Sequence, residues 1–499
     1  MGRTWALLRN SWRQLTSMRT ALILLFLLAV AAIPGSVLPQ RSVNATRVGQ
    51  YLADHPTLGP WLDRVWAFDV FSSPWFSAIY LLLFTSLVGC VVPRLRDHVR
   101  ALRSVPPDAP ARLERLPQHA AGLTHDGDVA SVATILRRHR WRTVVRGQSV
   151  SAEKGYLKET GNLLFHFALL AVLFGVALGS WYGWHANRLV VAGSDGAFCN
   201  TVQQYDEYGL GARVDAGDLA PFCFELTDFS ASYLDSGQPV SFSAGASLTG
   251  PAVGRPRVAH FSVNSPLRLT DANVYLLGHG YAPILRYTDR FGQTQTTVAP
   301  FLPVDGGLTS EGVAAFPDVN RREPKQQMAF DGLYLPTAPE TGPVLRSTHP
   351  EERAPALMLV AYRGDLGLDA GIPQSVYVLN QRQVRAGQLT QVGDAKLLRP
   401  GGSWTLDDGT TVEFVGTRQW VTLSIRYDPG ERVVLVSVIL LLVGLMLSLT
   451  GKRRRIWVRV TPAPDGGRSL IEAGGLARSD HPGFAAEFRA LTQRISGED

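Results

Sequence analysis

The stretch that decides the fold is AEKGYLKETGNLLFHFALLAVLFGVALGSWYGWH, residues 152–185. It begins with charged residues, becomes apolar at Leu163 and ends in an aromatic cluster around Trp181. A run of about 20 apolar residues is long enough to cross the hydrocarbon core of a bilayer as a helix. The one ionisable side chain in the apolar part is His166. Because ionisable groups inside a membrane are costly, this histidine is a candidate functional residue.

Three other apolar runs stand in the 499-residue chain, so we predict four transmembrane helices. They are expected at residues 20–38, 75–92, 163–182 and 432–450. The first run follows basic residues and resembles a signal peptide. The later spans, and a following sequence without a small-x-small cleavage site, favour a span that is retained.

The positions of basic residues predict how the chain is oriented in the membrane. Arginine clusters precede the first span, follow the second and follow the fourth, whereas residues 39–74 hold few basic residues. Both termini and residues 93–162 are therefore expected in the cytoplasm of a multi-pass plasma-membrane protein, with residues 39–74 and 183–431 outside. The net charge of +7 reflects this topology. No basic stretch on a predicted soluble domain is interleaved with aromatic residues, so no nucleic-acid partner is expected.

The segments between the spans predict two further folded parts. Residues 183–431 contain short alternating runs, such as 222–229 and 421–427, which predict a large extracytoplasmic all-β domain, a sandwich or open barrel. Residues 119–155 and the tail 451–499 each carry helix and strand patterns but bury too little alone, so we expect them to pack together as a small cytoplasmic α/β unit. Residues 1–19 are either an amphipathic cytoplasmic segment on the inner membrane surface or an ordinary basic flank.

The fold class is thus an α-helical membrane protein with four transmembrane helices, a large extracytoplasmic all-β domain and a small cytoplasmic α/β unit. Cys199 and Cys223 both lie outside, where disulfides persist, and are a candidate pair. The sequence leaves open whether their Cα atoms come within reach. Cys90, in the second span, is expected to be a reduced packing residue. The absence of Cys-x-x-Cys argues against a thioredoxin-like role or a self-contained c-type haem site.

The histidine in the third span has two interpretations. His166 is either a packing residue bonded to a neighbouring Ser or Thr, or a functional group. As a functional group it would be a haem or metal ligand, or a proton relay. His185 follows, just outside the span, and is a second candidate ligand, although interfacial histidines are common. His279 is expected to be an ordinary surface or core residue. No hydrolase, kinase, phosphate-loop or zinc-helix signature occurs, so no self-contained catalytic site and no metal site apart from haem iron are predicted.

Several short motifs follow one another in a specific order along nearly the whole chain. They are Ala152-Glu153-Lys154-Gly155, Gly161-Asn162 and His166; Val263-Asn264-Ser265-Pro266-Leu267, Tyr275 and Gly280-Tyr281-Ala282-Pro283; and Arg426-Tyr427-Asp428-Pro429-Gly430. In this order they resemble the ResB family, the larger partner in the system II machinery for cytochrome c maturation. Each motif alone is weak, but their order and spacing together are specific.

The resemblance implies a subunit that pairs with a multi-span ResC-type protein. Together they are expected to carry haem b across the membrane and present it for thioether attachment to apocytochrome c, with a thiol-reducing system and membrane lipid as further partners. In fused members of the family a histidine in a membrane span helps to ligate haem, and this role maps onto His166. The haem would be shared with the partner. Some members have an outer histidine close before the last span, but no histidine occurs here between His349 and His481.

A second function remains open on the sequence. The chain would then be a non-haem membrane-anchored scaffold or receptor whose outer β domain binds a partner protein. A transporter is less compatible, since four spans without inverted halves make a poor alternating-access device. Whether haem ligation counts as enzymatic for this subunit is likewise open, because the chemistry belongs to the complex as much as to one chain.

Overall fold

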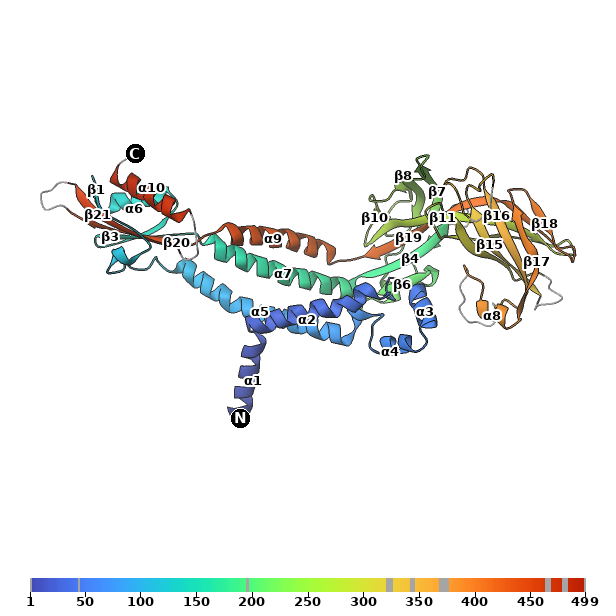
Figure 1. Ribbon diagram of the computed structural model, residues 1–499, viewed down its shortest axis with the longest axis horizontal. Helices are drawn as coiled ribbons and strands as arrows, with labels where there is room; N and C mark the ends of the chain where they lie inside the picture. The colour runs from blue at the N-terminus through green and yellow to red at the C-terminus, as the bar shows by residue number, and fades with distance from the viewer. Residues whose placement is uncertain are drawn as a thin grey trace. The chain divides into compact units, whose positions relative to one another are not determined.

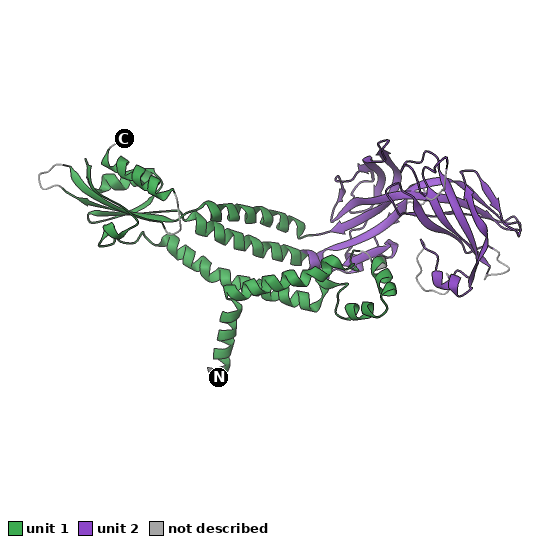
Figure 2. Ribbon diagram, in the orientation of Figure 1, with its two compact units in different colours: residues 1–178, 429–499 green, residues 179–428 purple. Residues whose placement is uncertain are grey.

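The computed structural model describes residues 2–43, 45–193, 197–319, 326–341, 346–367, 377–462, 468–477 and 483–497. The chain divides into two compact units (Figure 2): unit 1 contains residues 1–178 and 429–499, and unit 2 contains residues 179–428. Among the described residues, four helices are long and apolar enough to cross a membrane. They are α2 (Met18–Val37), α5 (Pro74–Arg103), α7 (Leu157–Tyr182) and α9 (Glu431–Thr450) (Figure 1). The prediction of four spanning helices is confirmed.

Two of these helices are longer than the sequence predicted. Helix α5 continues through Pro93 to Arg103, beyond the apolar run predicted at residues 75–92. Helix α7 begins at Leu157, before the predicted start at residue 163. The physical reason is the same at both ends. Hydropathy marks only the apolar part of a helix, whereas the backbone hydrogen bonds continue into the charged turns beside it.

Small residues allow α7 and α9 to pack closely. A Cβ atom on Gly161 would stand 2.5 Å from the backbone nitrogen of Ser448 and 2.7 Å from the carbonyl oxygen of Gly444. Further along, a Cβ atom on Gly175 would lie 2.8 Å from Cγ2 of Val434. Helices in membranes commonly associate through such small residues, because close approach increases van der Waals contact. The glycines therefore fix the face that α7 turns toward α9.

Helix α5 is anchored to the turn that precedes α2. The hydroxyl of Ser86 donates to the carbonyl oxygen of Leu15 at 2.6 Å, and Sγ of Cys90 lies 2.7 Å from the carbonyl oxygen of Thr16. Cys90 is a free cysteine.

The other helices of this part of unit 1 are α1 (Gly2–Leu15), α3 (Ala45–Asp54) and α4 (Leu58–Arg64), with short 3-10 turns η1 (Val70–Ser72) and η2 (Leu113–Arg115).

Unit 1 also contains a five-stranded antiparallel sheet in the order β1-β21-β20-β3-β2. Its elements are β1 (Gln118–His125), α6 (Val129–Arg138), β2 (Arg142–Arg146), β3 (Ser149–Lys154), β20 (Arg454–Thr461), β21 (Ser469–Ala477) and α10 (Phe484–Ser496). The tail strand β20 lies between β3 and β21, so the two distant chain segments share one sheet. Leu136 of α6, Val458 of β20 and Phe488 of α10 lie in the same buried core. Neither segment forms this core without the other.

Unit 2 is β-rich, as predicted, and its described strands form three sheets. The largest follows the order β10-β11-β19-β4-β6, with β12 on β11 and β18 on β19; the others are β13-β14-β15-β16-β17 and β5-β7-β8-β9. The elements are β4 (Trp184–Val191), β5 (Ala197–Cys199), η3 (Val202–Gln204), β6 (Glu207–Leu210), η4 (Ala216–Asp218), β7 (Cys223–Tyr233), β8 (Pro239–Thr249), β9 (Arg257–Phe261), β10 (Leu267–Leu269), β11 (Ala272–Thr288), β12 (Thr294–Val298), β13 (Leu302–Pro303), β14 (Ser310–Phe316), β15 (Gln327–Leu335), β16 (Ala356–Gly364), α8 (Gln381–Arg385), β17 (Leu389–Leu398), β18 (Ser403–Thr405) and β19 (Thr411–Tyr427).

The two longest strands, β11 and β19, organise unit 2. Each has 17 residues, and they pair antiparallel along nearly their whole length. One end of the pair contributes Val274 and Leu423 to a first buried core, and the other end contributes Leu285 and Phe414 to a second.

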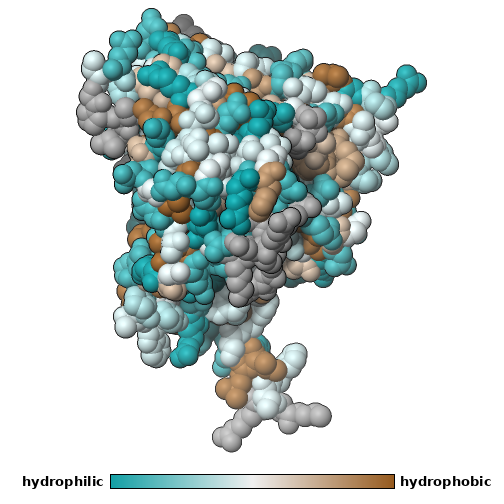
Figure 3. All heavy atoms as spheres, turned by 90° about the vertical axis from the view of Figure 1, so that its right-hand side faces the viewer, coloured by the Kyte–Doolittle hydropathy of each residue, from teal (hydrophilic) through white to brown (hydrophobic). Residues whose placement is uncertain are grey.

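On the face seen in Figure 3, hydrophilic residues dominate and hydrophobic residues are scattered among them.

Candidate functional site

The side chain of His166 lines a small cavity of about 110 Å³ within unit 1. The cavity is formed by three helices, α2, α5 and α7. Its walls are mostly apolar, with a few polar groups; they comprise Met18, Ala21, Leu22, Leu87, Cys90, Val91, Arg94, Asn162, Leu163 and His166. Leu87, Val91 and Leu163 also form a buried cluster, so part of the cavity wall is well packed. The residue that the sequence singled out therefore borders a cavity.

The imidazole of His166 is held in one tautomer. Nδ1 lies 2.7 Å from the carbonyl oxygen of Asn162, one turn earlier on α7. A carbonyl oxygen only accepts hydrogen bonds, so Nδ1 carries the proton and donates it. In that tautomer Nε2 keeps its lone pair, which is the state that a metal ligand requires. If His166 were a packing residue, the sequence led us to expect a hydrogen bond to a Ser or Thr hydroxyl. The hydrogen bond observed is to a backbone carbonyl oxygen instead.

A buried carboxylate joins the start of α7 to the C-terminal tail. Glu153, whose side chain is 2% exposed, accepts hydrogen bonds from Arg453, from Nε of Arg455 at 3.1 Å and from the hydroxyl of Tyr156 at 2.6 Å. Burial alone raises the pKa of this carboxyl. The hydrogen bonds from Arg453 and Tyr156 and the charges of the two arginines outweigh burial, so the pKa of Glu153 lies below its usual range.

The same network continues to α5. Nη1 of Arg453 lies 3.0 Å from Oε1 of Glu159, and Oε2 of Glu159 lies 3.5 Å from Nδ1 of His98. Nε2 of His98 is 3.0 Å from the hydroxyl of Thr160. Sequence reasoning missed His98, because the helix that carries it was assigned to a loop. The recurrence of Arg94, His98 and Ala101 at helical spacing was the available signal.

The second histidine candidate lies in a different setting. His185 does not extend α7, which ends at Tyr182; it lies on β4 of unit 2, where it pairs with Arg426 of β19 and Gly209 of β6. Its ring covers Gly209, whose added Cβ atom would come 2.5 Å from Cε1 of the imidazole. A packing role within the sheet explains these contacts.

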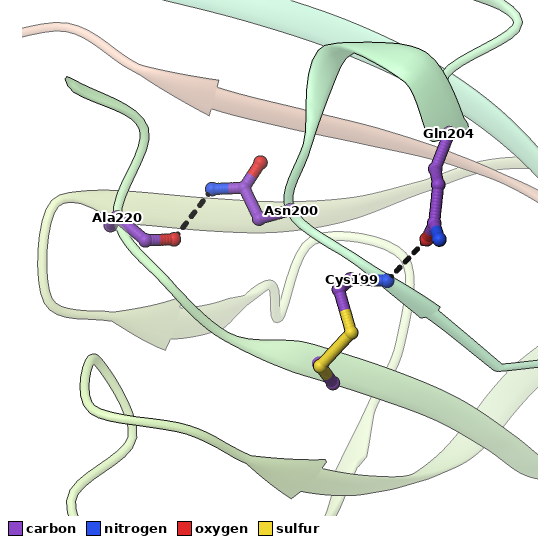
Figure 4. The surroundings of a disulfide bond; sticks show 5 residues. Cys199, Asn200, Gln204 and Ala220 are labelled. Atoms are coloured by element: carbon purple, nitrogen blue, oxygen red, sulfur yellow. Dashed lines mark hydrogen bonds between the residues drawn. A yellow bond between two sulfur atoms is a disulfide. The ribbon is translucent and has the colours of Figure 1, made fainter. Parts of the chain in front are cut away.

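The two outer cysteines are joined by a disulfide in the structure. Cys199 of β5 and Cys223 of β7 are directly paired across neighbouring strands (Figure 4). Nearby, Nδ2 of Asn200 donates to the carbonyl oxygen of Ala220 at 2.8 Å, and the backbone N–H of Cys199 donates to the side chain of Gln204. The bond therefore ties the short strand β5 to the edge of a three-strand ladder.

A histidine in unit 2 is enclosed by aromatic rings. His279 contacts Phe229 and Phe242, and its Nε2 lies 2.9 Å from the hydroxyl of Tyr233. Burial lowers the pKa of His279 to about 4, so its ring is neutral near pH 7. These contacts describe a satisfied core histidine. Among the described residues, no group of three or more His, Cys, Asp or Glu side chains is arranged to hold a metal ion.

Comparisons with known proteins cover nearly the whole chain. Residues 18–489 match the ResB-like family. Cytochrome c biogenesis protein CcsB of Synechococcus sp. (strain WH7803) is 25% identical over 96% of both chains. The protein of the same name from Synechococcus sp. (strain CC9311) is 24% identical over 98% of both chains. The one from Gloeobacter violaceus is 24% identical over 87% of this chain and 81% of its own.

Proposed function

Because the chain belongs to the ResB-like family, we propose that it is a subunit of the machinery that matures c-type cytochromes. With a multi-span ResC-type partner it carries haem b across the membrane and presents it for thioether attachment to apocytochrome c. The names of the CcsB relatives support the role in cytochrome c biogenesis. The haem is the cargo of the complex, and it is shared between the two subunits.

The observation that carries this proposal is the state of His166. Its Nδ1 is committed to the carbonyl oxygen of Asn162, and Nε2 keeps the lone pair that iron would accept. The ring borders a cavity whose walls are mainly apolar, which suits a flat apolar macrocycle inside a membrane. A cavity of about 110 Å³ is smaller than the ~300 Å³ or more of ordinary ligand pockets. The chain therefore supplies the ligand and one wall, and the partner covers the rest.

We also propose a topology for the chain. Both termini lie in the cytoplasm, the sheet β1-β21-β20-β3-β2 with α6 and α10 is a small cytoplasmic α/β unit, and unit 2 lies outside with its sheets packed as a sandwich. The disulfide between Cys199 and Cys223 supports the outer location, since such bonds persist in oxidising compartments. The exposed side chains of Trp5 and Trp12 on α1 support a helix lying on the inner membrane surface.

The test of the haem proposal is the visible spectrum of the chain purified together with its ResC-type partner. We expect the native complex to show a Soret band, His166→Gly to lose it, and added imidazole to restore it by occupying the space of the missing ring. His55→Gly is the matched control, because His55 is exposed and lies outside the spanning helices. It is expected to leave the spectrum unchanged.

The alternative function makes the opposite prediction. If the chain is a scaffold without haem of its own, His166→Gly leaves both the haem content of the complex and the maturation of cytochrome c unchanged. The binding of a partner protein would then depend on the outer surface of unit 2. Unchanged haem in the variant, at equal amounts of folded complex, would reject the ligand role of His166.

A further inference from the structure

A second cavity lies beside the one that His166 borders. It has a volume of about 410 Å³ and, unlike its neighbour, most of the residues that line it are charged or polar. The two cavities share Arg94, Asn162 and Leu163 as lining residues, so they adjoin along the same part of α5 and α7. Whatever occupies the first cavity therefore has a charged compartment next to it, toward the start of α7.

The second cavity is lined by acidic residues that have basic partners and by two basic residues without an acidic partner among the described residues. Asp97 lies 3.8 Å from Arg100, and Glu159 lies 3.0 Å from Arg453, so both carboxylates on the wall have a basic partner. The remaining cations are Arg94 and Lys158, which are exposed. Arg94 lies 2.6 Å from Sδ of Met18, and within the described ranges neither Arg94 nor Lys158 forms an ion pair with a carboxylate. The cavity thus offers two cations to an anionic ligand.

A buried histidine also lines this compartment. The side chain of His98 is 7% exposed and lines the cavity. Its Nδ1 makes no hydrogen bond to any residue that the structure describes, although it lies 3.5 Å from Oε2 of Glu159. A buried polar atom without a hydrogen bond is destabilising unless a ligand or water satisfies it. This atom is an observation independent of the two cations, and it too points to a bound polar group.

We propose that the polar cavity binds the carboxylates of the haem whose iron His166 ligates, with Arg94 and Lys158 as the cations that pair with them. This inference rests on the proposed function and extends it to the other end of the same ligand. A haem carries both of its carboxylates on one edge of the ring, and a carboxylate is costly to hold in hydrocarbon without a cation. The edge that leaves the apolar cavity therefore enters the compartment that contains the cations.

The spacing along α7 agrees with this arrangement. His166, Asn162 and Lys158 follow one another at intervals of four residues, so they lie on one side of the helix. At about 1.5 Å per residue, Lys158 starts roughly 12 Å from His166 along the helix axis, and its flexible side chain adjusts the remaining distance. Arg94 borders both cavities and lies between the two ends. The histidine thus borders the mainly apolar cavity, and the two cations line the neighbouring charged cavity. A ligand with an apolar centre and two carboxylates on one edge fits this arrangement.

The experiment compares two probes on the haem-depleted complex of this chain with its ResC-type partner. The probes are haem b and its dimethyl ester, in which both carboxylates are capped, and the readout is the Soret absorbance during titration. We expect the native complex to bind haem b at least about tenfold more tightly than the diester, since charge-assisted hydrogen bonds of this kind change affinity by that order. The variant Arg94→Gln/Lys158→Gln is expected to lose this preference while still binding the diester as native does.

Controls separate a lost charge from a misfolded complex. Arg96→Gln removes an exposed arginine of the same helix that does not line the cavity, and it should keep the preference. Arg94→Lys and Lys158→Arg retain the charges and should restore it. Equal binding of haem b and diester by the native complex overturns the inference. A preference for haem b that survives in the double variant also overturns it. If that variant keeps the preference but loses binding to phosphatidylglycerol vesicles, the two cations bind lipid headgroups and not the carboxylates of haem.

The two proposals fail in different ways. If His166→Gly abolishes the Soret band and imidazole restores it, but capping the carboxylates has no effect, the ligand role stands and the carboxylate site is rejected. If the complex binds both probes equally well with and without His166, the ligand role of His166 is rejected, and the carboxylate site that depends on it is rejected as well.

Discussion

Replacing Glu153 by glutamine tests the buried network that joins the tail to α7. The carboxylate of Glu153 is 2% exposed and accepts hydrogen bonds from Arg453, Arg455 and Tyr156. The amide of glutamine keeps the shape of the side chain but removes its charge, and it places an N–H₂ donor near groups that are themselves donors. We therefore expect Glu153→Gln to destabilise the sheet in which β3 and β20 pair.

The magnitude follows from which charges lose their partner. Removing one member of a buried ion pair costs about 3–5 kcal/mol, because the other charge stays buried without compensation. Arg453, 10% exposed, keeps Glu159 at 3.0 Å, and Arg455, 29% exposed, is partly solvated. Both facts reduce the loss, so we take the lower end, about 3 kcal/mol. A loss of this size lowers the ratio of folded sheet to locally unfolded (open) sheet on the order of a hundredfold.

Proteolysis of the full chain in detergent measures this ratio. When opening is fast relative to cleavage, the cleavage rate follows the population of the open form. Glu153→Gln should raise the rate of cuts within residues 118–154 and 454–477 about a hundredfold and leave cuts in unit 2 unchanged. Adding Arg453→Gln should recover part of the loss, since no buried arginine then lacks its carboxylate.

Asp126→Asn is the matched control for this measurement. Asp126 also accepts two hydrogen bonds from one arginine, Arg468, but both side chains are exposed, at 66% and 61%. Exposed ion pairs contribute little to stability, so the cleavage rate should barely change. If Glu153→Gln behaves like Asp126→Asn, the buried network does not hold the tail to the sheet and the reasoning is wrong.

Three further experiments test the packing on which both units depend. Replacing Cys199 and Cys223 by alanine should destabilise unit 2 by about 3 kcal/mol in denaturant unfolding, the cost of reopening a loop of this length. His279 has its pKa lowered to about 4 in the folded chain, so the unfolded chain takes up a proton first as pH falls from 6.5 toward 4, and unit 2 becomes less stable over this range. His279→Gln should reduce this dependence of the thermal unfolding temperature on pH. Gly444→Leu should separate α7 from α9 and reduce the thermal stability of the detergent-solubilised chain, whereas Gly49→Leu, whose added Cβ has no neighbour within 4 Å, should not.

The sequence predicted what depends on local pattern and missed what depends on tertiary contact. Apolar runs of spanning length identified the four membrane helices, and alternation identified the β-rich region. The apolar runs did not show how far α5 and α7 continue, because charged helical turns carry no hydropathy signal. His185 was expected to follow the helix, but its place on β4 is set by strands β19 and β6, which lie far away in the sequence. His166 was found from its own type and position, since a histidine in an apolar run is conspicuous without any partner.

The partners of the site could not be found in that way. Residues such as Arg94, Lys158 and Arg453 are ordinary charged residues in the sequence, where they indicate only topology. They acquire a second role because α5, α7 and the tail meet around one cavity. The same charges that orient a membrane protein are therefore available to bind an anionic ligand, as we propose, and only the fold shows which of them line the same cavity.

The motif residues of the opening stretch show how closely the site depends on the tail. Glu153 pairs with Arg453, and Gly155 has a φ of +103°, with a Cβ position that would overlap the carbonyl of Lys452. Gly161 then brings α9 against α7, one turn and a half before His166. Each contact joins the segment that carries the histidine to residues almost 300 positions later. The placement of α7 therefore depends on contacts with α9 and the tail as well as on its own residues. If the proposed haem role is right, damage to the tail sheet should alter haem binding without any change in the residues that line the cavity.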